Sequence, residues 1–338
     1  MILLDRLASD AVLDAAHEWL CHRQRDYPDH ADIWSLRRDW TNERARIKRE
    51  LVAGRFRFGL LDRITREGGE VIDLWSARDA LVLKALAIVL VEALPVSPHC
   101  THIKGHGGAK AAVRRVMAHL PVNAFVLRTD VKSYYAAIDH HLLLDRLAVH
   151  VKDRRVLNLL GQYMRRTAER GGSFWDHERG ISLGCPLSPL MAAFYLHELD
   201  QCMARTGLFY VRFMDDILVL APTRWKLRHA VKAVNQVLGS LRLDKHPDKT
   251  FIGRIAKGFD FLGYHFGSNG LTVAKATIEK FLERAARLYE QERERSESPS
   301  ALGTYVRRWI GWARAGVPSV KDATTTVAIL RPDQWRCS

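Results

Sequence analysis

Residues 210–220 read Tyr-Val-Arg-Phe-Met-Asp-Asp-Ile-Leu-Val-Leu, two apolar strand-like arms that meet at the adjacent carboxylates of Asp215 and Asp216. A solvated turn is the ordinary interpretation of an isolated Asp-Asp pair, and a tight hairpin between apolar strands would normally use Asn-Gly or Asp-Gly. Here both flanks are apolar, and an unpaired buried carboxylate is costly. We therefore expect a positively charged partner at this tip.

A third acid ends another strand-like segment earlier in the chain. Residues 124–131 read Ala-Phe-Val-Leu-Arg-Thr-Asp-Val, so a run of strand formers delivers Asp130 to its end. If the strands pair, Asp130, Asp215 and Asp216 converge. Such an acidic cluster suits Mg²⁺, which keeps waters and takes one or two carboxylates plus substrate phosphates. Two such ions, about 3.5–4 Å apart, would stabilise the attacking and leaving oxygens of a phosphoryl transfer.

The charge balance narrows the class of partner. The chain has 338 residues and a formal net charge of +14, which points to a polyanion, either nucleic acid or a membrane surface. The longest apolar stretch, residues 85–94, carries Glu92, and Asp5 and Arg6 interrupt the apolar start of the chain. We therefore expect a cytoplasmic protein without a membrane span or a signal peptide. Together with the acidic cluster, the charge suggests nucleotidyl transfer on a nucleic acid.

Periodicity gives a coarse view of the elements around these strands. Helical spacing of apolar residues predicts helices in the first 55 residues and over residues 79–94. Residues 66–70, Arg-Glu-Gly-Gly-Glu, are expected as a hairpin turn because glycine supplies the positive φ that it needs. Residues 259–266 are expected as a strand-like run that turns at residues 267–270.

Further motifs surround the three aspartates. In chain order they are Asp130-Val131-Lys132-Ser133-Tyr134-Tyr135 with Ile138-Asp139-His140, then Gly180 to Pro189, Phe213-Met214-Asp215-Asp216, Leu241 to Thr250, and Gly258 to Tyr264. In this order and at these spacings they resemble the palm motifs, the aromatic-x-Asp-Asp box and the primer-grip hairpin of reverse transcriptases. The resemblance is to the bacterial group II intron and retron lineage and covers residues from about 55 to 315. Several linked motifs are far more specific than any one alone.

The resemblance implies an α+β right-hand polymerase with fingers, a palm built on an antiparallel sheet, and a short helical thumb. The expected domains are a helical N-terminal extension (1–55), fingers (56–120), palm (121–270, with a finger-like helical insertion at about 150–180), thumb (271–315) and a C-terminal tail (316–338). The residues after the thumb are too few for the DNA-binding and endonuclease domains of mobile intron proteins. We therefore expect a stand-alone enzyme.

The resemblance also implies roles for single residues. Asp130, Asp215 and Asp216 would be catalytic and would hold two Mg²⁺ ions, and Tyr135 would exclude a ribose 2′-OH. The other nucleotide-binding candidates are Lys249, Arg66, Arg63, Gly184 and Leu183, the primer-grip candidates are Phe261, Leu262, Gly263 and Tyr264, and the template-binding candidates are Lys104, Gly105, Gly107 and Lys110. Plainer interpretations stay open: core packing for Tyr135, a solvated side chain for Lys249, a turn that starts a helix at Gly184, and a flexible loop for 105–110.

Two departures from the family pattern concern the nucleotide site. Leu183 stands where the family has a glutamine, a replacement that resembles diversity-generating reverse transcriptases, although the motif here ends in Ser188-Pro189. In the fingers hairpin the Gly-Lys-x-Arg pattern is replaced by residues 69–72, Gly-Glu-Val-Ile, which lack both bases. Arg63 and Arg66 are the nearest substitutes for triphosphate contacts.

The expected function is RNA-directed DNA polymerisation, a magnesium-dependent nucleotidyltransferase reaction that adds dNTPs to a primer 3′ end. The expected partners are a structured non-coding RNA template, a DNA or RNA primer and, as an open alternative, an accessory subunit or a second copy. The expected setting is a retron-like or antiviral defence system. The alternatives are an error-prone enzyme of the diversity-generating type, a polymerase of relaxed sugar choice, and a catalytically idle nucleic-acid-binding module of the same fold.

Overall fold

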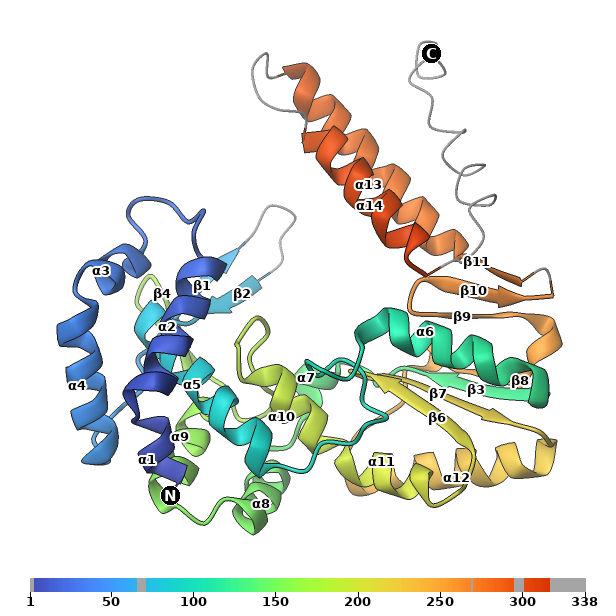
Figure 1. Ribbon diagram of the computed structural model, residues 1–338, viewed down its shortest axis with the longest axis horizontal. Coiled ribbons are helices and arrows are strands. Elements are labelled where there is room, and N and C mark those ends of the chain that lie inside the picture. The colour runs from blue at the N-terminus through green and yellow to red at the C-terminus, as the bar shows by residue number, and fades with distance from the viewer. Residues whose placement is uncertain (1–2, 66–70, 269, 295–300, 317–338) are drawn as a thin grey trace. The chain divides into compact units, whose positions relative to one another are not determined.

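The computed structural model describes residues 3–65, 71–268, 270–294 and 301–316 (Figure 1). The chain forms two compact units that alternate along the sequence. The first unit consists of Met1–Ile103, Val131–Cys202 and Val234–Lys245, and the second of Lys104–Asp130, Met203–Ala233 and His246–Ser338. Helices and mainly antiparallel sheets occur in both units, which confirms the α+β class. No helix in the described ranges is long and apolar enough to span a membrane.

The first unit is mostly helical and is built around one apolar helix, α5 (Ala77–Ala93). Leu81, Val82 and Leu86 on this helix are fully buried, because α1, α2 and α3 pack against it. Ser76 caps its start by accepting a hydrogen bond from the backbone N–H of Asp79. The helices of this unit are α1 (Leu3–Leu7), α2 (Asp10–Arg23), α3 (Asp32–Arg38), α4 (Trp40–Val52), α5, α7 (Tyr134–Ala137), α8 (His140–His150), α9 (Arg154–Met164), α10 (Ser188–Tyr195), most of α11 (His197–Ala204) and the part of α12 (Arg224–Ser240) from Val234 onward.

A four-stranded sheet of order β2-β1-β4-β5 also belongs to the first unit. Its strands are β1 (Leu61–Thr65), β2 (Val71–Leu74), β4 (Thr167–Arg170) and β5 (Ser173–Asp176). Strands β1 and β2 pair antiparallel, with Arg63 opposite Asp73 and Thr65 opposite Val71. The expected turn at residues 66–70, Arg66 included, lies outside the described residues, and so does the tail from residue 317.

The second unit contains an antiparallel sheet of order β6-β7-β3-β8. Its strands are β3 (Phe125–Thr129), β6 (Phe209–Phe213), β7 (Asp216–Ala221) and β8 (Phe251–Arg254). Helix α6 (Gly108–His119) covers one face through Ala112, Val113 and Val116, which pack with strand residues such as Val126 and Leu218 (Figure 1). On the other side lies the first half of α12 (Arg224–Ser240), where Leu227 and Ala230 are buried.

A smaller sheet and a helical hairpin complete the second unit. The sheet has the order β11-β10-β9, from β9 (Phe259–Phe261), β10 (Tyr264–Gly267) and β11 (Gly270–Val273). The expected strand-like run over residues 259–266 is interrupted at Leu262 and Gly263, whose positive φ values of 49° and 84° form a tight turn between β9 and β10. Helices α13 (Lys275–Glu294) and α14 (Ala301–Arg314) then pack through stacked rings of Phe281 and Trp309, 4.2 Å apart.

Within the first unit, backbone hydrogen bonds hold Gly180 and Ile181 against α7 and the residue that follows it. The N–H of Gly180 donates to the carbonyl of Ile138 (2.8 Å), and the N–H of Ile181 donates to that of Tyr135 (2.7 Å). Gly180 has a φ of 78°, and a Cβ there would lie 2.8 Å from the Cα of Ala136. The backbone approach therefore requires glycine at this position. At Gly184, with a φ of 77°, a Cβ would meet nothing within 4 Å.

These two glycines form a matched pair for a stability test. Gly180→Ala suffers both left-handed strain and a backbone clash, so we expect a loss of about 2–4 kcal/mol in the free energy of unfolding. Gly184→Ala suffers the strain alone, and we expect a loss of about 1 kcal/mol. Urea denaturation of both variants measures the difference. Equal losses would contradict the close approach of residue 180 to α7.

Candidate active site

The hairpin formed by β6 and β7 ends in a two-residue loop. Phe213 pairs with Asp216, which leaves Met214 and Asp215 at the tip, and Met214 adopts a left-handed φ of 55°. A non-glycine residue in this region carries about 1 kcal/mol of strain. Arg212 is fully buried, and its Nη1 donates to the Met214 carbonyl at 2.8 Å. The turn is thus held by a charged side chain inside the sheet.

Strand register brings the third aspartate to the same end of the sheet. Strand β3 pairs with β7 so that Thr129 faces Ile217, and Asp130 therefore follows β3 where Asp216 begins β7. The carbonyl of Asp130 accepts a hydrogen bond from the N–H of His246 at 2.8 Å, which fixes its backbone. Asp130, Asp215 and Asp216 all belong to the second unit. The structure thus brings together the three carboxylates that form the acidic cluster.

Two cations meet this cluster. The ammonium of Lys249, at the end of the short turn Pro247–Lys249, donates to Oδ2 of Asp130 at 2.6 Å, although its side chain is 53% exposed. This contact raises the pKa of Lys249. Nη2 of Arg128 lies 3.9 Å from Oδ1 of Asp216. The structure therefore places Lys249 beside the first aspartate and bonded to its carboxylate, while its contact with a nucleotide stays a prediction.

The cations do not balance the carboxylates. Burial, a hydrogen bond with Asp130 and the negative charges of Asp130 and Asp216 raise the pKa of Asp215 to about 7. Burial and the charge of Asp130 raise the pKa of Asp216 to about 6, against the opposing effect of Arg128 and Lys249. Near neutral pH the site is therefore short of positive charge.

The chemistry of the donors fits a hard divalent cation. The cluster offers carboxylate oxygens that touch one another, and a cation between them would remove the repulsion that raises their pKa values. In the described ranges, no three His, Cys, Asp or Glu side chains already stand at the spacing of a complete metal cage.

The other nucleotide-binding candidates belong to the first unit. Tyr135, on α7, is half-buried and meets Tyr134 edge-on with ring centroids 6.0 Å apart. Its carbonyl accepts the hydrogen bond from Ile181, so the structure ties Tyr135 to the segment that presents Leu183 and Gly184. Leu183 is 65% exposed, and Gly184 is exposed as well. Their contacts with a nucleotide stay predictions.

Arg63 is engaged within the sheet of the first unit. Its guanidinium makes two hydrogen bonds with the carboxylate of Asp73, at 2.7 and 3.0 Å, and lies 4.3 Å from the ring centroid of Trp175. The bond with Arg63 is the main reason that the pKa of Asp73 is lowered. A role for Arg63 in binding triphosphate therefore requires an exchange of partners.

The primer-grip and template candidates belong to the second unit. Phe261 and Tyr264 are buried in its core, and Leu262 and Gly263 form the turn between them. The Lys110 ammonium donates to the hydroxyl of Tyr264 and lies 4.0 Å from the ring centroid of Trp312, and burial lowers its pKa to about 8. The remaining template candidates, Lys104, Gly105 and Gly107, are exposed.

Sequence reasoning missed two arginines next to the acidic cluster. Arg212 supports the hairpin turn from a fully buried position, and Arg128 faces Asp216. The available signal was a basic residue inside each of the two apolar strands that carry the aspartates. A base in such a strand needs a partner as much as an acid does.

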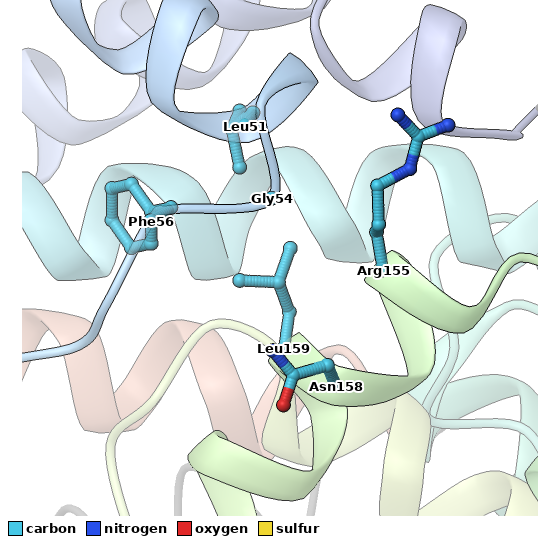
Figure 2. Close-up of a pocket in the computed structure, with 6 residues that line it drawn as sticks. All are labelled: Leu51, Gly54, Phe56, Arg155, Asn158 and Leu159. Carbon is cyan, nitrogen blue, oxygen red and sulfur yellow. The ribbon is translucent and has the colours of Figure 1, made fainter.

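A small cavity elsewhere in the first unit is no substrate site. It measures about 10 Å³ and lies between α4 and α9 (Figure 2). That volume holds one water molecule at most. Its lining residues are Leu51, Gly54, Phe56, Arg155, Asn158 and Leu159.

Comparison with known families places the three aspartates in a shared segment. Residues 80–266, more than half of the chain, match the family model described as Reverse transcriptase (RNA-dependent DNA polymerase). This segment contains Asp130, Asp215 and Asp216. Among solved structures, a chain of the partial Cas6-RT-Cas1–Cas2 complex is similar, with a TM-score of 0.43 and 18% identity over 71% of this chain and 42% of that chain.

Two curated proteins are similar in sequence to part of the chain. Protein YkfC of Escherichia coli (strain K12) is 25% identical over 175 residues, covering 41% of this chain and 46% of that protein. Group II intron-encoded protein LtrA of Lactococcus lactis subsp. cremoris is 22% identical over 165 residues, covering 48% of this chain and 27% of LtrA. The chain thus spans less than half the length of these relatives.

The raised pKa of Asp215 predicts a pH-dependent stability difference. Because its pKa is about 7 in the folded chain against an ordinary 3.8, folding favours the protonated carboxyl. This contribution is complete below about pH 4 and is lost as pH rises through about 7. In a metal-free buffer with chelator, Asp215→Asn should gain about 1–2 kcal/mol over wild type between pH 5 and pH 8, allowing for solvent screening. Urea unfolding at both pH values measures it. A constant difference would contradict the crowding of carboxylates.

Proposed function

The chain belongs to the reverse transcriptase (RNA-dependent DNA polymerase) family, and from this premise we propose that it adds dNTPs to a primer 3′ end on an RNA template. The observation that carries the proposal is the contact between the carboxyl groups of Asp130 and Asp215, with Asp216 beside them. These three residues would hold the catalytic metals, which makes the family's motif chemically complete in this chain.

The acidic cluster supports a two-metal reaction. When bound, two Mg²⁺ ions about 3.5–4 Å apart supply stabilisation of the attacking and leaving oxygens in an in-line displacement. The register of β3 and β7 supports this arrangement, because it brings Asp130 to the end of the sheet where Asp215 and Asp216 lie. Arg212, through the Met214 carbonyl, holds the loop that carries Asp215. The chain itself therefore contributes a fixed, negatively charged edge of the sheet to the reaction.

Lys249 is suited to bind substrate phosphate. Its side chain is more than half exposed, so its ammonium can exchange the Asp130 carboxylate for a phosphate oxygen while staying near the cluster. The carboxylates keep its pKa raised, so the side chain stays cationic at neutral pH. Tyr135 would exclude the ribose 2′-OH, and the exposed side chain of Leu183 would contact the nucleotide or the template.

We further propose the biological setting. The motifs resemble the group II intron and retron lineage, which supports a dedicated structured RNA as template and a retron-like or antiviral defence role. Such an enzyme would use a DNA or RNA primer in the cytoplasm, where an accessory subunit can join it. The exposed leucine at position 183 supports the error-prone alternative, because an apolar side chain replaces the family's glutamine there.

The direct test is primer extension on an RNA template with Mg²⁺ and either dNTPs or rNTPs. Wild type should extend the primer with dNTPs and much less with rNTPs. Asp215→Asn and Asp216→Asn should each lower the rate at least about a hundredfold, because each removes a charge that the transition state requires. Asp26→Asn, which changes an aspartate with an 85% exposed side chain far from the cluster in sequence, is the matched control.

The outcomes separate the alternatives. Equal incorporation of rNTPs would favour the enzyme of relaxed sugar choice. Absence of extension by wild type, with RNA binding retained, would favour the idle binding module. Full activity in Asp216→Asn would contradict the role of the acidic cluster.

A further inference from the structure

A second site of unbalanced charge lies in the first unit. A cavity of about 290 Å³ opens beside strands β1 and β4, close to the size of the smaller ligand pockets in proteins. Among the residues that the structure describes, no carboxylate lines it. We call it the arginine cavity, and its lining residues are Phe58, Gly59, Leu60, Trp75, Gln162, Arg165, Arg166 and Thr167.

Arg166 gives this cavity a buried positive charge. The residue is only 8% exposed, and its Nη1 donates to the carbonyls of Met164 (3.2 Å) and Gly180 (2.9 Å). Its Nε has no hydrogen-bond partner, and burial lowers its pKa. The hydroxyl of Tyr163, the carboxylate of Asp73 and the thiol of Cys185 favour its charge, and Asp73 already binds Arg63. Carbonyl groups do not neutralise a guanidinium, so the charge is left without a counterion among the described residues.

Arg165 adds a second, exposed cation at the same cavity. It lines the cavity and is exposed to solvent. Both side chains line the cavity, and an anion bound there would offset the buried charge of Arg166. Guanidinium groups are well matched to phosphate because their N–H donors form a planar fork. The charge pattern therefore selects a phosphate-bearing ligand.

The remaining walls supply flat aromatic surface. The rings of Phe58 and Trp75 meet edge-on, with centroids 5.5 Å apart. Gln162 fixes Phe58 by accepting a hydrogen bond from its N–H at 3.2 Å, and the indole N–H of Trp75 donates to the hydroxyl of Ser182 at 3.0 Å. These walls are already positioned, and aromatic side chains are the surfaces on which unpaired bases stack.

We propose that the arginine cavity binds one nucleotide, with its phosphate at Arg165 and Arg166 and its base against Phe58 and Trp75. The proposal rests on the proposed function, since it names a second place where the same class of substrate is held. The nucleotide comes either free or as part of an unpaired strand. Because Trp75 bonds Ser182 and Arg166 bonds Gly180, an occupied cavity also steadies the segment that presents Leu183.

Binding assays without catalysis test this site. The full chain is titrated, in chelator and without divalent ions, with adenosine 5′-monophosphate and with a fluorescent oligo(U) of about twelve nucleotides. Arg165→Ala and Phe58→Leu should each weaken binding about tenfold, since one removes a phosphate contact and the other a stacking surface. Arg154→Ala, an exposed arginine on the same helix α9, is the matched control and should change binding much less. Thermal unfolding confirms that each variant is folded.

Each outcome decides the proposal. If both cavity variants bind adenosine monophosphate more weakly than wild type does, the cavity is a site for free nucleotides. If they bind only the oligonucleotide more weakly, the cavity is a site for an unpaired strand. If Arg165→Ala and Phe58→Leu bind both probes as Arg154→Ala does, the proposal is overturned. The Asp215→Asn, Asp216→Asn protein should retain the binding. The binding result at the arginine cavity therefore does not depend on whether the chain is active in the polymerase assay.

Discussion

The antiparallel pairing of β3 with β7 is the constraint on which the acidic cluster depends. It places Thr129 opposite Ile217 and thereby sets Asp130 against Asp215 and Asp216, residues far apart in the sequence. A shift of the register by one residue would turn these side chains to the other face of the sheet. The apolar core beneath α6 fixes the register. The packing of this core therefore offsets the repulsion between the carboxylates.

The two sites carry an excess of opposite charge, and each excess attracts an ion of the other sign. The second unit holds carboxylates in excess over Lys249 and Arg128, which calls for metal cations. The first unit holds Arg165 and Arg166 at a cavity that no described carboxylate lines, which favours phosphate. Neither imbalance contributes to the stability of the chain by itself. Both are explained when the chain is considered together with a nucleic acid and its metal ions.

The sequence was sufficient for the local features that a short pattern encodes. Apolar arms around Asp215 and Asp216 predicted the hairpin, and strand formers before Asp130 predicted β3. It was not sufficient where a side chain finds a partner far along the chain. The ammonium of Lys110, a template-binding candidate, contacts Tyr264 and Trp312, which lie far along the chain. The turn at Leu262 interrupts an apparently continuous strand. The burial of Arg166 has no signal in the sequence near it, because it depends on tertiary packing.

Direct measurement of metal binding tests the central claim that the three carboxylates act together on a cation. Mn²⁺ takes the same oxygen ligands as Mg²⁺ and is counted by electron paramagnetic resonance. Wild type should bind Mn²⁺ with release of protons at pH 7, because the metal displaces the proton that the pKa of about 7 leaves on Asp215. Asp130→Asn should lose most of this binding. Equal Mn²⁺ binding by Asp130→Asn and wild type would contradict the account.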